Sequence, residues 1–149
     1  MAKLARERPE LRVVADQVGA PTSARSIAGA LMSILSAGSK DLDLNLIKRR
    51  FAELDGLVHL SNRGETSWYG FADAIVAGLR SRDIPIAVTN IAAIGTEEYP
   101  TKATRPLNSR LDMTRLENVA GIQMPHWQEA LDLELDDFVR CDSTSPAKE

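Results

Sequence analysis

The spacing of the glycines is the feature that most restricts what this sequence can fold into. The chain has 149 residues and nine glycines, and no two glycines lie closer than six residues apart. A dinucleotide-binding fold needs closely spaced glycines after its first strand, so that the backbone can approach a pyrophosphate at a helix N-terminus. Neither that loop nor a P-loop can be built from these glycines. We therefore predict that this chain alone holds no nucleotide cofactor.

Apolar residues nevertheless recur at helical spacing in several places, and short β-branched or apolar runs lie between them. Helices are expected at residues 2–8, 22–37, 46–54 and 114–119. Two further helices are expected to begin after a cap at Thr66 or Ser67 and at about Pro125. Strands are expected at residues 11–14, 57–60 and 86–91. The pattern predicts an α/β or α+β fold in which helices pack on a few short strands.

A long segment at residues 95–109 has two prolines and no apolar periodicity. Loops of this length are uncommon in compact domains and are often functional. Arg105 lies just before Pro106, which restricts the backbone, and a guanidinium offers paired donors suited to a phosphate. A surface arginine before a turn is the alternative interpretation.

A second loop, residues 17–22, follows the first predicted strand and opens a helix, where open α/β sheets place ligand-binding groups. The Gln17 amide is suited to contact a base or a sugar. On local grounds ordinary turn chemistry explains the loop more simply, with a positive φ at Gly19, rigidity from Pro21, and Thr22 or Ser23 as the helix cap.

The sequence offers no catalytic or metal-binding set. A Tyr-x-x-x-Lys pair is absent, because Asp73 lies four residues after Tyr69 and a proline interrupts the segment after Tyr99. His59 and His126 have no carboxylate or cysteine at a ligand spacing. We predict no catalytic residues and no metal site, and we interpret the acidic positions of the last helix as a solvated face.

Composition limits the partners and the location. The net charge of −3 and the pI near 5.5 argue against nucleic-acid binding. No apolar stretch is long enough for a membrane span and no signal peptide begins the chain, so we expect a cytoplasmic protein. Cys141 is interpreted as an incidental thiol. We expect one domain at residues 1–140 and a disordered tail at residues 141–149.

Several motifs in order resemble the C-terminal half of the dTDP-4-dehydrorhamnose reductases, which are extended short-chain dehydrogenases. The most specific are Gln-x-Gly-x-Pro-Thr at residues 17–22 and Arg-Pro-x-Asn-Ser at residues 105–109. The remaining motifs lie at residues 3–8, 11–14, 56–60, 64–68, 71–72, 98–101 and 125–131. The resemblance covers about nine tenths of the chain, and it implies a substrate-binding part without the N-terminal Rossmann half.

The resemblance implies a reductase in which NADPH or NADH delivers hydride to the keto carbon of a dTDP-linked 6-deoxyhexulose, giving dTDP-L-rhamnose. It assigns the pyrophosphate to Arg105 and implies that Trp68 packs within the part that closes over the substrate. The candidate contacts to the dTDP-sugar, or residues that shape its loops, are Gln17, Thr22, Asn108 and Ser109.

The sequence departs from the family pattern in two ways. The cofactor loop and the tyrosine–lysine pair are absent, and residues 36–54 resemble an insertion. A part without these groups is expected to be inactive alone, and to depend on a separate Rossmann-containing chain or on a homo-oligomer. The alternatives are a non-catalytic module that binds a nucleotide sugar or a protein, and a truncated remnant.

Overall fold

The computed structural model describes residues 1–36 and 43–144 and shows a mixed α/β fold with two short sheets. In the first sheet β1 (Glu10–Val14) runs parallel to β4 (Asn90–Ile94), with Val14 opposite Ile94. In the second sheet β2 (Val18–Gly19) is antiparallel to β3 (Thr66–Ser67). Parallel strands need a long crossover, and here the connection from β1 to β4 carries β2, β3 and three helices.

The predicted helices are present, with shifted ends. They are α1 (Ala2–Glu7), α2 (Ala24–Ser36), α3 (Leu44–Glu53), α4 (Trp68–Arg80), α5 (Thr114–Ala120) and α6 (Trp127–Thr144). The short 3₁₀ helix η1 (Thr96–Glu98) lies in the segment expected to be irregular and was not predicted. Side-chain caps explain two of the starts. The Asp43 carboxylate accepts from the backbone N–H of Asn45, so α3 begins before residue 46, and Ser67 accepts from the N–H of Gly70 at the start of α4.

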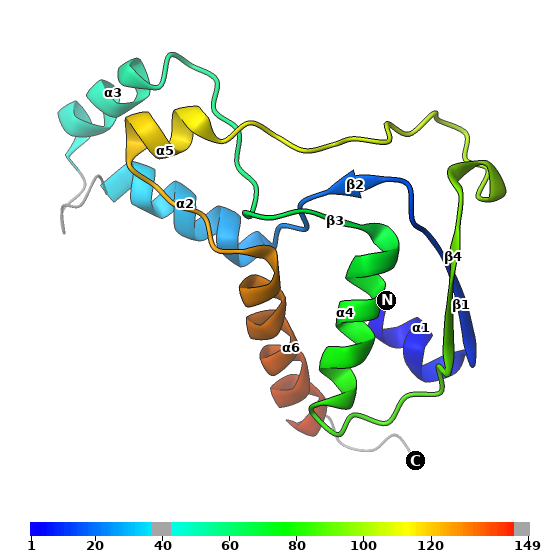
Figure 1. Cartoon of the computed structure of the whole chain (residues 1–149). Coiled ribbons are helices and arrows are strands. Elements are labelled where there is room, and N and C mark those ends of the chain that lie inside the picture. Colours follow the sequence, from blue (N-terminus) through cyan, green and yellow to red (C-terminus); the bar gives the residue numbers. More distant parts are fainter. Residues whose placement is uncertain (37–42, 145–149) are drawn as a thin grey trace.

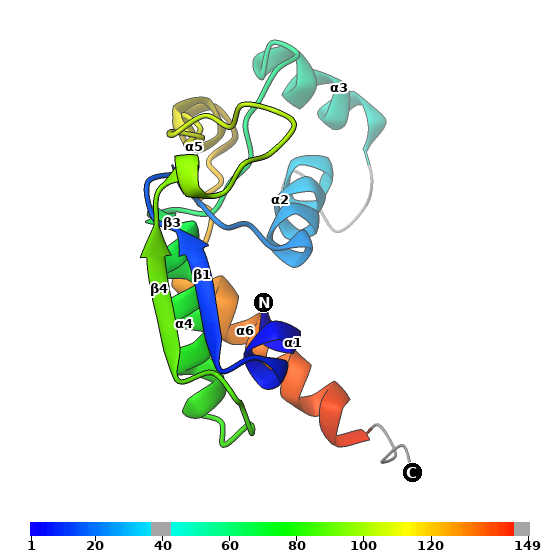
Figure 2. The same ribbon diagram turned by 90° about the vertical axis from the view of Figure 1, so that its right-hand side faces the viewer.

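The first hydrophobic core lies between the β1–β4 sheet and helices α1, α4 and α6. Figure 2 shows the two strands side by side with α4 behind them and α6 beyond α4. The buried members of this core are Ala5, Leu11, Val13, Ala72, Ile75, Val76, Leu79, Val88 and Leu135. Phe71 and Trp127 add an edge-to-face contact between α4 and α6, with ring centroids 6.0 Å apart.

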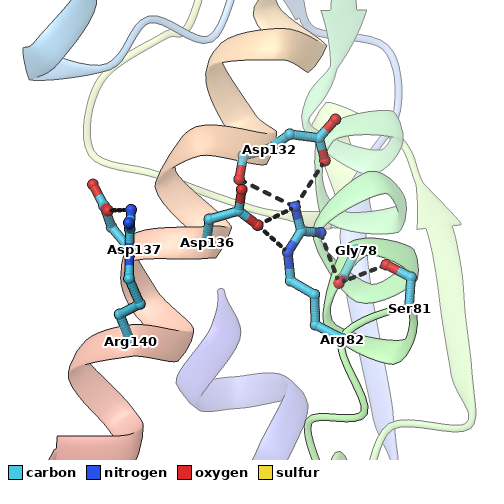
Figure 3. A network of polar contacts seen from close by, with 7 residues as sticks. All are labelled: Gly78, Ser81, Arg82, Asp132, Asp136, Asp137 and Arg140. Carbon is cyan, nitrogen blue, oxygen red and sulfur yellow. Dashed lines mark hydrogen bonds and ion pairs between the residues drawn. The ribbon is translucent and has the colours of Figure 1, made fainter.

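Polar contacts also hold α4 against α6, around the side chain of Arg82 (Figure 3). Its Nε donates to Asp136 Oδ1 at 2.8 Å, and its Nη2 donates to the Asp132 carbonyl at 3.1 Å. Nη1 donates to the Gly78 carbonyl of α4 at 3.1 Å. The Asp136 carboxylate raises the pKa of the Arg82 guanidinium above its ordinary value. The predicted solvated face of α6 is thus exposed at Asp132 and Asp136, and part of it anchors α4.

A second core joins α2, the end of α3, and α5, at the other end of the molecule (Figure 1). Its buried residues are Ala30, Ile34, Leu54, Leu116 and Met124. The predicted apolar face of α2 is only partly covered, because Ile27 and Leu31 remain 37% and 45% exposed. Part of the apparent insertion, residues 37–42, lies outside the described residues.

One strand prediction is wrong and another is shifted along the chain. Residues 57–60 form no strand, and Leu57 is 68% exposed. Val58 and Leu60 instead pack their side chains against the second core. The β-branched run at 86–91 enters its strand only at Asn90, because the N–H groups of Ala87 and Val88 donate to the Ala5 carbonyl of α1.

Helix α6 continues through residue 144, so the first residues of the predicted tail at 141–149 are helical. Residues 145–149 lie outside the described part of the chain. Within the described residues no helix combines the length and the apolar character that a membrane span needs.

Candidate functional site

A cavity of about 500 Å³ lies where the two cores meet. Four elements converge on it: the β2–β3 sheet and the first turns of α2, α4 and α6 (Figure 1). The volume falls within the range of small-molecule sites. Its lining residues from the strands and loops are Gln17, Val18, Gly19, Ala20, Pro21, Thr22, Ser23, Asn62, Thr66, Ser67 and Ser109. The helices add Ala24, Trp68, Phe71, Trp127, Ala130, Leu131 and Glu134.

Gln17 lines this cavity, and its amide is held from behind by a chain of hydrogen bonds. Its Nε2 donates to Thr96 Oγ1 at 3.1 Å, and that hydroxyl donates to Asp16 Oδ1 at 2.7 Å. The backbone N–H of Thr96 donates to the other Asp16 carboxylate oxygen at 3.0 Å. The hydrogen bonds from Thr96 lower the pKa of Asp16 below its ordinary value, so this carboxyl is ionised at neutral pH.

Thr22 lies on the cavity wall and joins two loops instead of capping α2. Its Oγ1 donates to the Ala20 carbonyl at 2.9 Å and accepts from the backbone N–H of Asn62 at 3.0 Å. Ser23 is the residue whose hydroxyl accepts from the N–H of Ser26 in the first turn of α2.

Asn62 was not predicted, yet it is a buried polar residue on the cavity wall, 2% exposed. Its Nδ2 donates to the Pro21 carbonyl at 2.8 Å, which locks residues 17–22 in place. Its Oδ1 has no hydrogen-bond partner among the described residues. The Asn62 side chain therefore keeps one unused hydrogen-bond acceptor, its Oδ1, beside the cavity.

Ser109 also lines the cavity, and it connects the loop at 95–109 to β2. Its backbone N–H and its Oγ both donate to the Val18 carbonyl, at 2.9 Å and 3.1 Å. A Cβ on Gly19 would lie 2.6 Å from this Oγ. The positive φ predicted for Gly19 is wrong, since the positive-φ glycines of the described chain are Gly56, Gly64 and Gly121. Close approach of the Ser109 segment is the reason for glycine here.

The other two predicted contacts, Arg105 and Asn108, do not line the cavity. Arg105 is exposed, and within the described residues its guanidinium makes no hydrogen bond or ion pair. The Asn108 side chain accepts from Arg110 Nε at 2.9 Å, and Arg110 forms an ion pair with Glu65. The loop itself is more ordered than predicted, because it contains η1 and pairs with Val18.

The remaining wall of the cavity is apolar and aromatic. Phe71, Trp127 and Leu131 contribute it together with Trp68, which is 58% exposed at the start of α4. The expectation that Trp68 packs within its own domain is therefore wrong for this chain. An exposed indole beside a cavity offers a flat surface for a ring or for the apolar face of a sugar.

The charge of the wall restricts what the cavity can accept. Among the described lining residues only Glu134 carries a charged side chain, and Arg25 Nε lies 3.7 Å from its Oε1. That lining therefore contains no cation to offset a phosphate. The cavity suits an uncharged, partly apolar group, and an attached diphosphate would have to lie outside it.

The described residues contain no group of three or more histidine, cysteine, aspartate or glutamate side chains placed to hold a metal ion. The His59 ring contacts the Asp112 carbonyl at 3.2 Å and lines a separate cavity of about 260 Å³ with Leu57, Asp112 and Arg115. The His126 ring packs against Gly64 and lies beside Trp127. The His126 ring thus has a packing role, whereas His59 is exposed and contacts the Asp112 carbonyl at the surface.

Sequence reasoning found Gln17, Thr22 and Ser109 but missed Asn62 and Thr96. Thr96 directly follows Gly95, at the start of the loop singled out for function, so its position was a usable signal. Asn62 gave no local signal, because its role depends on a hydrogen bond to Pro21, 41 residues away in sequence.

Comparison with known proteins identifies the family. The family model described as RmlD substrate binding domain matches residues 1–140. The dTDP-4-dehydrorhamnose reductase of Burkholderia thailandensis is 42% identical over 135 residues, which make up 89% of this chain and 43% of that protein. The reductase of Sinorhizobium fredii is 39% identical, covering 87% of this chain and 40% of its own length.

Solved structures agree with this assignment. A dTDP-4-dehydrorhamnose reductase from Clostridium acetobutylicum matches 93% of this chain and 42% of its own chain, with a TM-score of 0.67 and 30% identity. The Bacillus anthracis reductase, solved in complex with NADP, matches 91% of this chain and 41% of its own, with a TM-score of 0.64 and 29% identity. The chain thus spans less than half the length of the relatives it matches, and it belongs to the RmlD substrate binding domain family.

Proposed function

We propose that residues 1–140 form the nucleotide-sugar-binding part of a dTDP-4-dehydrorhamnose reductase. The observation that carries this proposal is the cavity between the two cores. It brings together Gln17, Thr22 and Ser109, which come from both of the loops singled out in the sequence. A chain of this family with such a cavity is suited to bind a dTDP-linked 6-deoxyhexulose.

In this proposal the uncharged and the charged parts of the ligand bind at different places. An uncharged end of the dTDP-sugar enters the cavity, where the aromatic wall and the Gln17 amide receive it. The diphosphate stays outside the cavity and meets the exposed guanidinium of Arg105, four residues before Ser109. Arg105 supplies the paired donors that a phosphate needs, and the described lining of the cavity supplies no cation.

The residues of this chain do not fit a dinucleotide cofactor. The loop between β1 and α2 has the one glycine Gly19, and the Ser109 hydroxyl occupies the space beside it. We therefore assign no step of hydride transfer to this chain. In the proposed reductase NADPH or NADH comes with a dinucleotide-binding part, from another chain or within an oligomer, and this chain alone is inactive. A cytoplasmic location stays a prediction from the sequence.

Isothermal titration calorimetry of the full chain with dTDP tests the proposal. We expect binding with a Kd that is millimolar or tighter. Arg105→Ala should weaken it about tenfold, because a charge-assisted hydrogen bond contributes about 1.5–3 kcal/mol. The matched control is Arg49→Ala, on exposed α3, where the side chain pairs only with Glu53 at 3.6 Å among the described residues. Absence of dTDP binding, or equal loss in both variants, contradicts the proposal.

A second measurement tests whether this chain lacks the part of the reductase that transfers hydride. NADPH oxidation is followed with a dTDP-4-keto-6-deoxyhexose and the isolated chain. We expect no turnover above a protein-free blank. Turnover by this chain alone contradicts the assignment of hydride transfer to another part, and it leaves the binding proposal intact.

A further inference from the structure

The side-chain amide of Gln17 has two possible orientations, which differ by exchange of its oxygen and nitrogen, and the hydrogen bonds around it decide between them. Asp16 is a carboxylate at neutral pH and only accepts hydrogen bonds. The Thr96 hydroxyl proton therefore points to Asp16 Oδ1, at 2.7 Å. The Thr96 oxygen is then left as an acceptor, and Gln17 must present its NH₂ group to it, at 3.1 Å.

This chain of hydrogen bonds leaves the Gln17 carbonyl oxygen as the end of the amide available to a ligand. No group among the described residues donates a hydrogen bond to it. Gln17 lines the cavity, whereas Thr96 does not, so the NH₂ group is used on the side away from the lining. The cavity is thereby offered a hydrogen-bond acceptor of fixed orientation.

Most other polar groups of the lining are occupied, and the two exceptions are further acceptors: the buried Asn62 Oδ1, which has no hydrogen-bond partner among the described residues, and the Glu134 carboxylate, whose Oε1 lies 3.7 Å from Arg25 Nε. The Thr22 hydroxyl donates to the Ala20 carbonyl, the Ser109 hydroxyl donates to the Val18 carbonyl, and the Ser67 hydroxyl accepts from the Gly70 N–H. A hexulose has several hydroxyl and carbonyl oxygens, and these would find few free hydrogen-bond donors here, because Thr22, Ser109 and the Asn62 amide already donate to backbone carbonyls. A flat, mostly apolar ring with a single N–H donor matches the aromatic wall and the Gln17 oxygen better.

We propose that the cavity receives the pyrimidine base, and that Asp16 and Thr96 are positioning residues that make Gln17 select a base carrying an N3–H donor. This inference rests on the proposed function, in which the ligand is a thymine nucleotide. Thymine and uracil both carry the N3–H group, whereas cytosine has an acceptor at N3. The fixed amide oxygen therefore binds the first two bases and opposes the third.

Calorimetric titration of the full chain with dTDP, dUDP and dCDP tests this selectivity. The wild-type chain should bind dTDP and dUDP with similar affinity and dCDP about tenfold more weakly, which is the ratio expected for one mismatched hydrogen bond. Including dUDP separates recognition of N3–H from recognition of the thymine methyl group. If dUDP binds as weakly as dCDP, the methyl group sets the preference and the inference is wrong.

Variants of the hydrogen-bond chain separate positioning from simple stability. Thr96→Val removes the hydroxyl and frees the amide to rotate, so the ratio of dCDP to dTDP dissociation constants should fall to about twofold or less. Asp16→Asn should also lower this ratio, because an amide at that position could donate to the Thr96 hydroxyl instead of accepting from it. Thr96→Ser should restore the wild-type ratio. Thr101→Val, the same change at an exposed threonine outside the lining, should keep it.

A wild-type ratio that survives in Thr96→Val overturns the role of Thr96, since the amide orientation would then not depend on it. A folded Thr96→Val chain is recognised by an unchanged melting temperature. If Thr96→Val unfolds, Asp16→Asn tests the same hydrogen-bond chain, and a wild-type ratio in that variant overturns the inference. If none of the three nucleotides binds the wild-type chain, the proposed function fails and this inference falls with it.

Discussion

At the scale of single residues, two glycines are required for different reasons. Gly19 is needed because the Ser109 hydroxyl approaches it closely. Gly64 has a φ of +79°, and a Cβ there would overlap the His126 ring. Next to it, the N–H of Arg63 donates to the Pro125 carbonyl, and the N–H of Trp127 donates to the Arg63 carbonyl. Gly64 therefore allows the chain to reach the start of α6, where the apolar wall of the cavity begins.

We predict that Gly64→Ala lowers the free energy of unfolding by about 1–3 kcal/mol, because a side chain is strained in the left-handed region. Gly29→Ala is the matched control. Gly29 lies in α2 with nothing within 4 Å of its Cβ position, so alanine should raise the free energy of unfolding by about 0.5–1 kcal/mol. Urea denaturation of both variants measures the difference. Equal effects of the two substitutions would contradict the role given to Gly64.

The sequence is informative about residues wherever their role is local. The Gln-x-Gly-x-Pro-Thr motif points to Gln17 and Thr22, and both line the cavity. The positive φ predicted for Gly19 is wrong because its constraint comes from Ser109, far along the chain. The position of Thr96 in the loop singled out for function was a usable signal, but its partner could not be predicted, since its hydroxyl meets an aspartate 80 residues away in sequence.

At the scale of elements, the contact between α4 and α6 determines the shape of the apolar wall. Leu79 and Leu135 are buried between these helices, and Phe71 meets Trp127 at their cavity end. Arg82 joins the same two helices from the other end of α4 with hydrogen bonds to Asp132 and Asp136. Its side chain is 19% exposed, so these contacts are less screened than an ordinary surface pair.

We predict that Arg82→Met lowers the free energy of unfolding by about 1 kcal/mol, since both aspartates remain largely exposed and their contribution is reduced by solvent. Arg49→Met, which breaks an exposed i,i+4 pair, should change it by less than about 0.5 kcal/mol. Urea denaturation followed by circular dichroism provides both values. A cost at Arg82 no larger than that at Arg49 would mean that the network in Figure 3 does not stabilise the helix pair.

Helices are predicted better than strands, and the reason is physical. Helical hydrogen bonds are local, so α4 begins at its Ser67 cap and α5 ends at Gly121, which has a left-handed φ, and both ends are set within their own segments. A strand needs a partner from elsewhere in the chain. The apolar run at 57–60 has no such partner in the described structure, and its two half-buried side chains serve the second core instead.

At the scale of the whole molecule, the two cores are joined through the β2–β3 sheet and the loops around it. The first core holds the β1–β4 sheet with α1, α4 and α6, and the second holds α2, α3 and α5. The cavity lies at their junction, and each of its walls comes from a segment distant from the others in sequence. The resemblance of the motifs implied a dTDP-sugar as ligand, but only this arrangement separates Gln17, Thr22 and Ser109, which line the cavity, from Arg105 and Asn108, which do not.

Above all, we propose that this chain binds a thymine nucleotide at the junction of its two cores. Amide chemical shifts of the isotopically labelled full chain, recorded during titration with dTDP, test it most directly. We predict saturable shifts at Gln17, Thr22, Trp68 and Ser109, with the amides of α3 unchanged. Shifts absent from these positions, or gathered instead around the separate cavity at His59, would contradict the account.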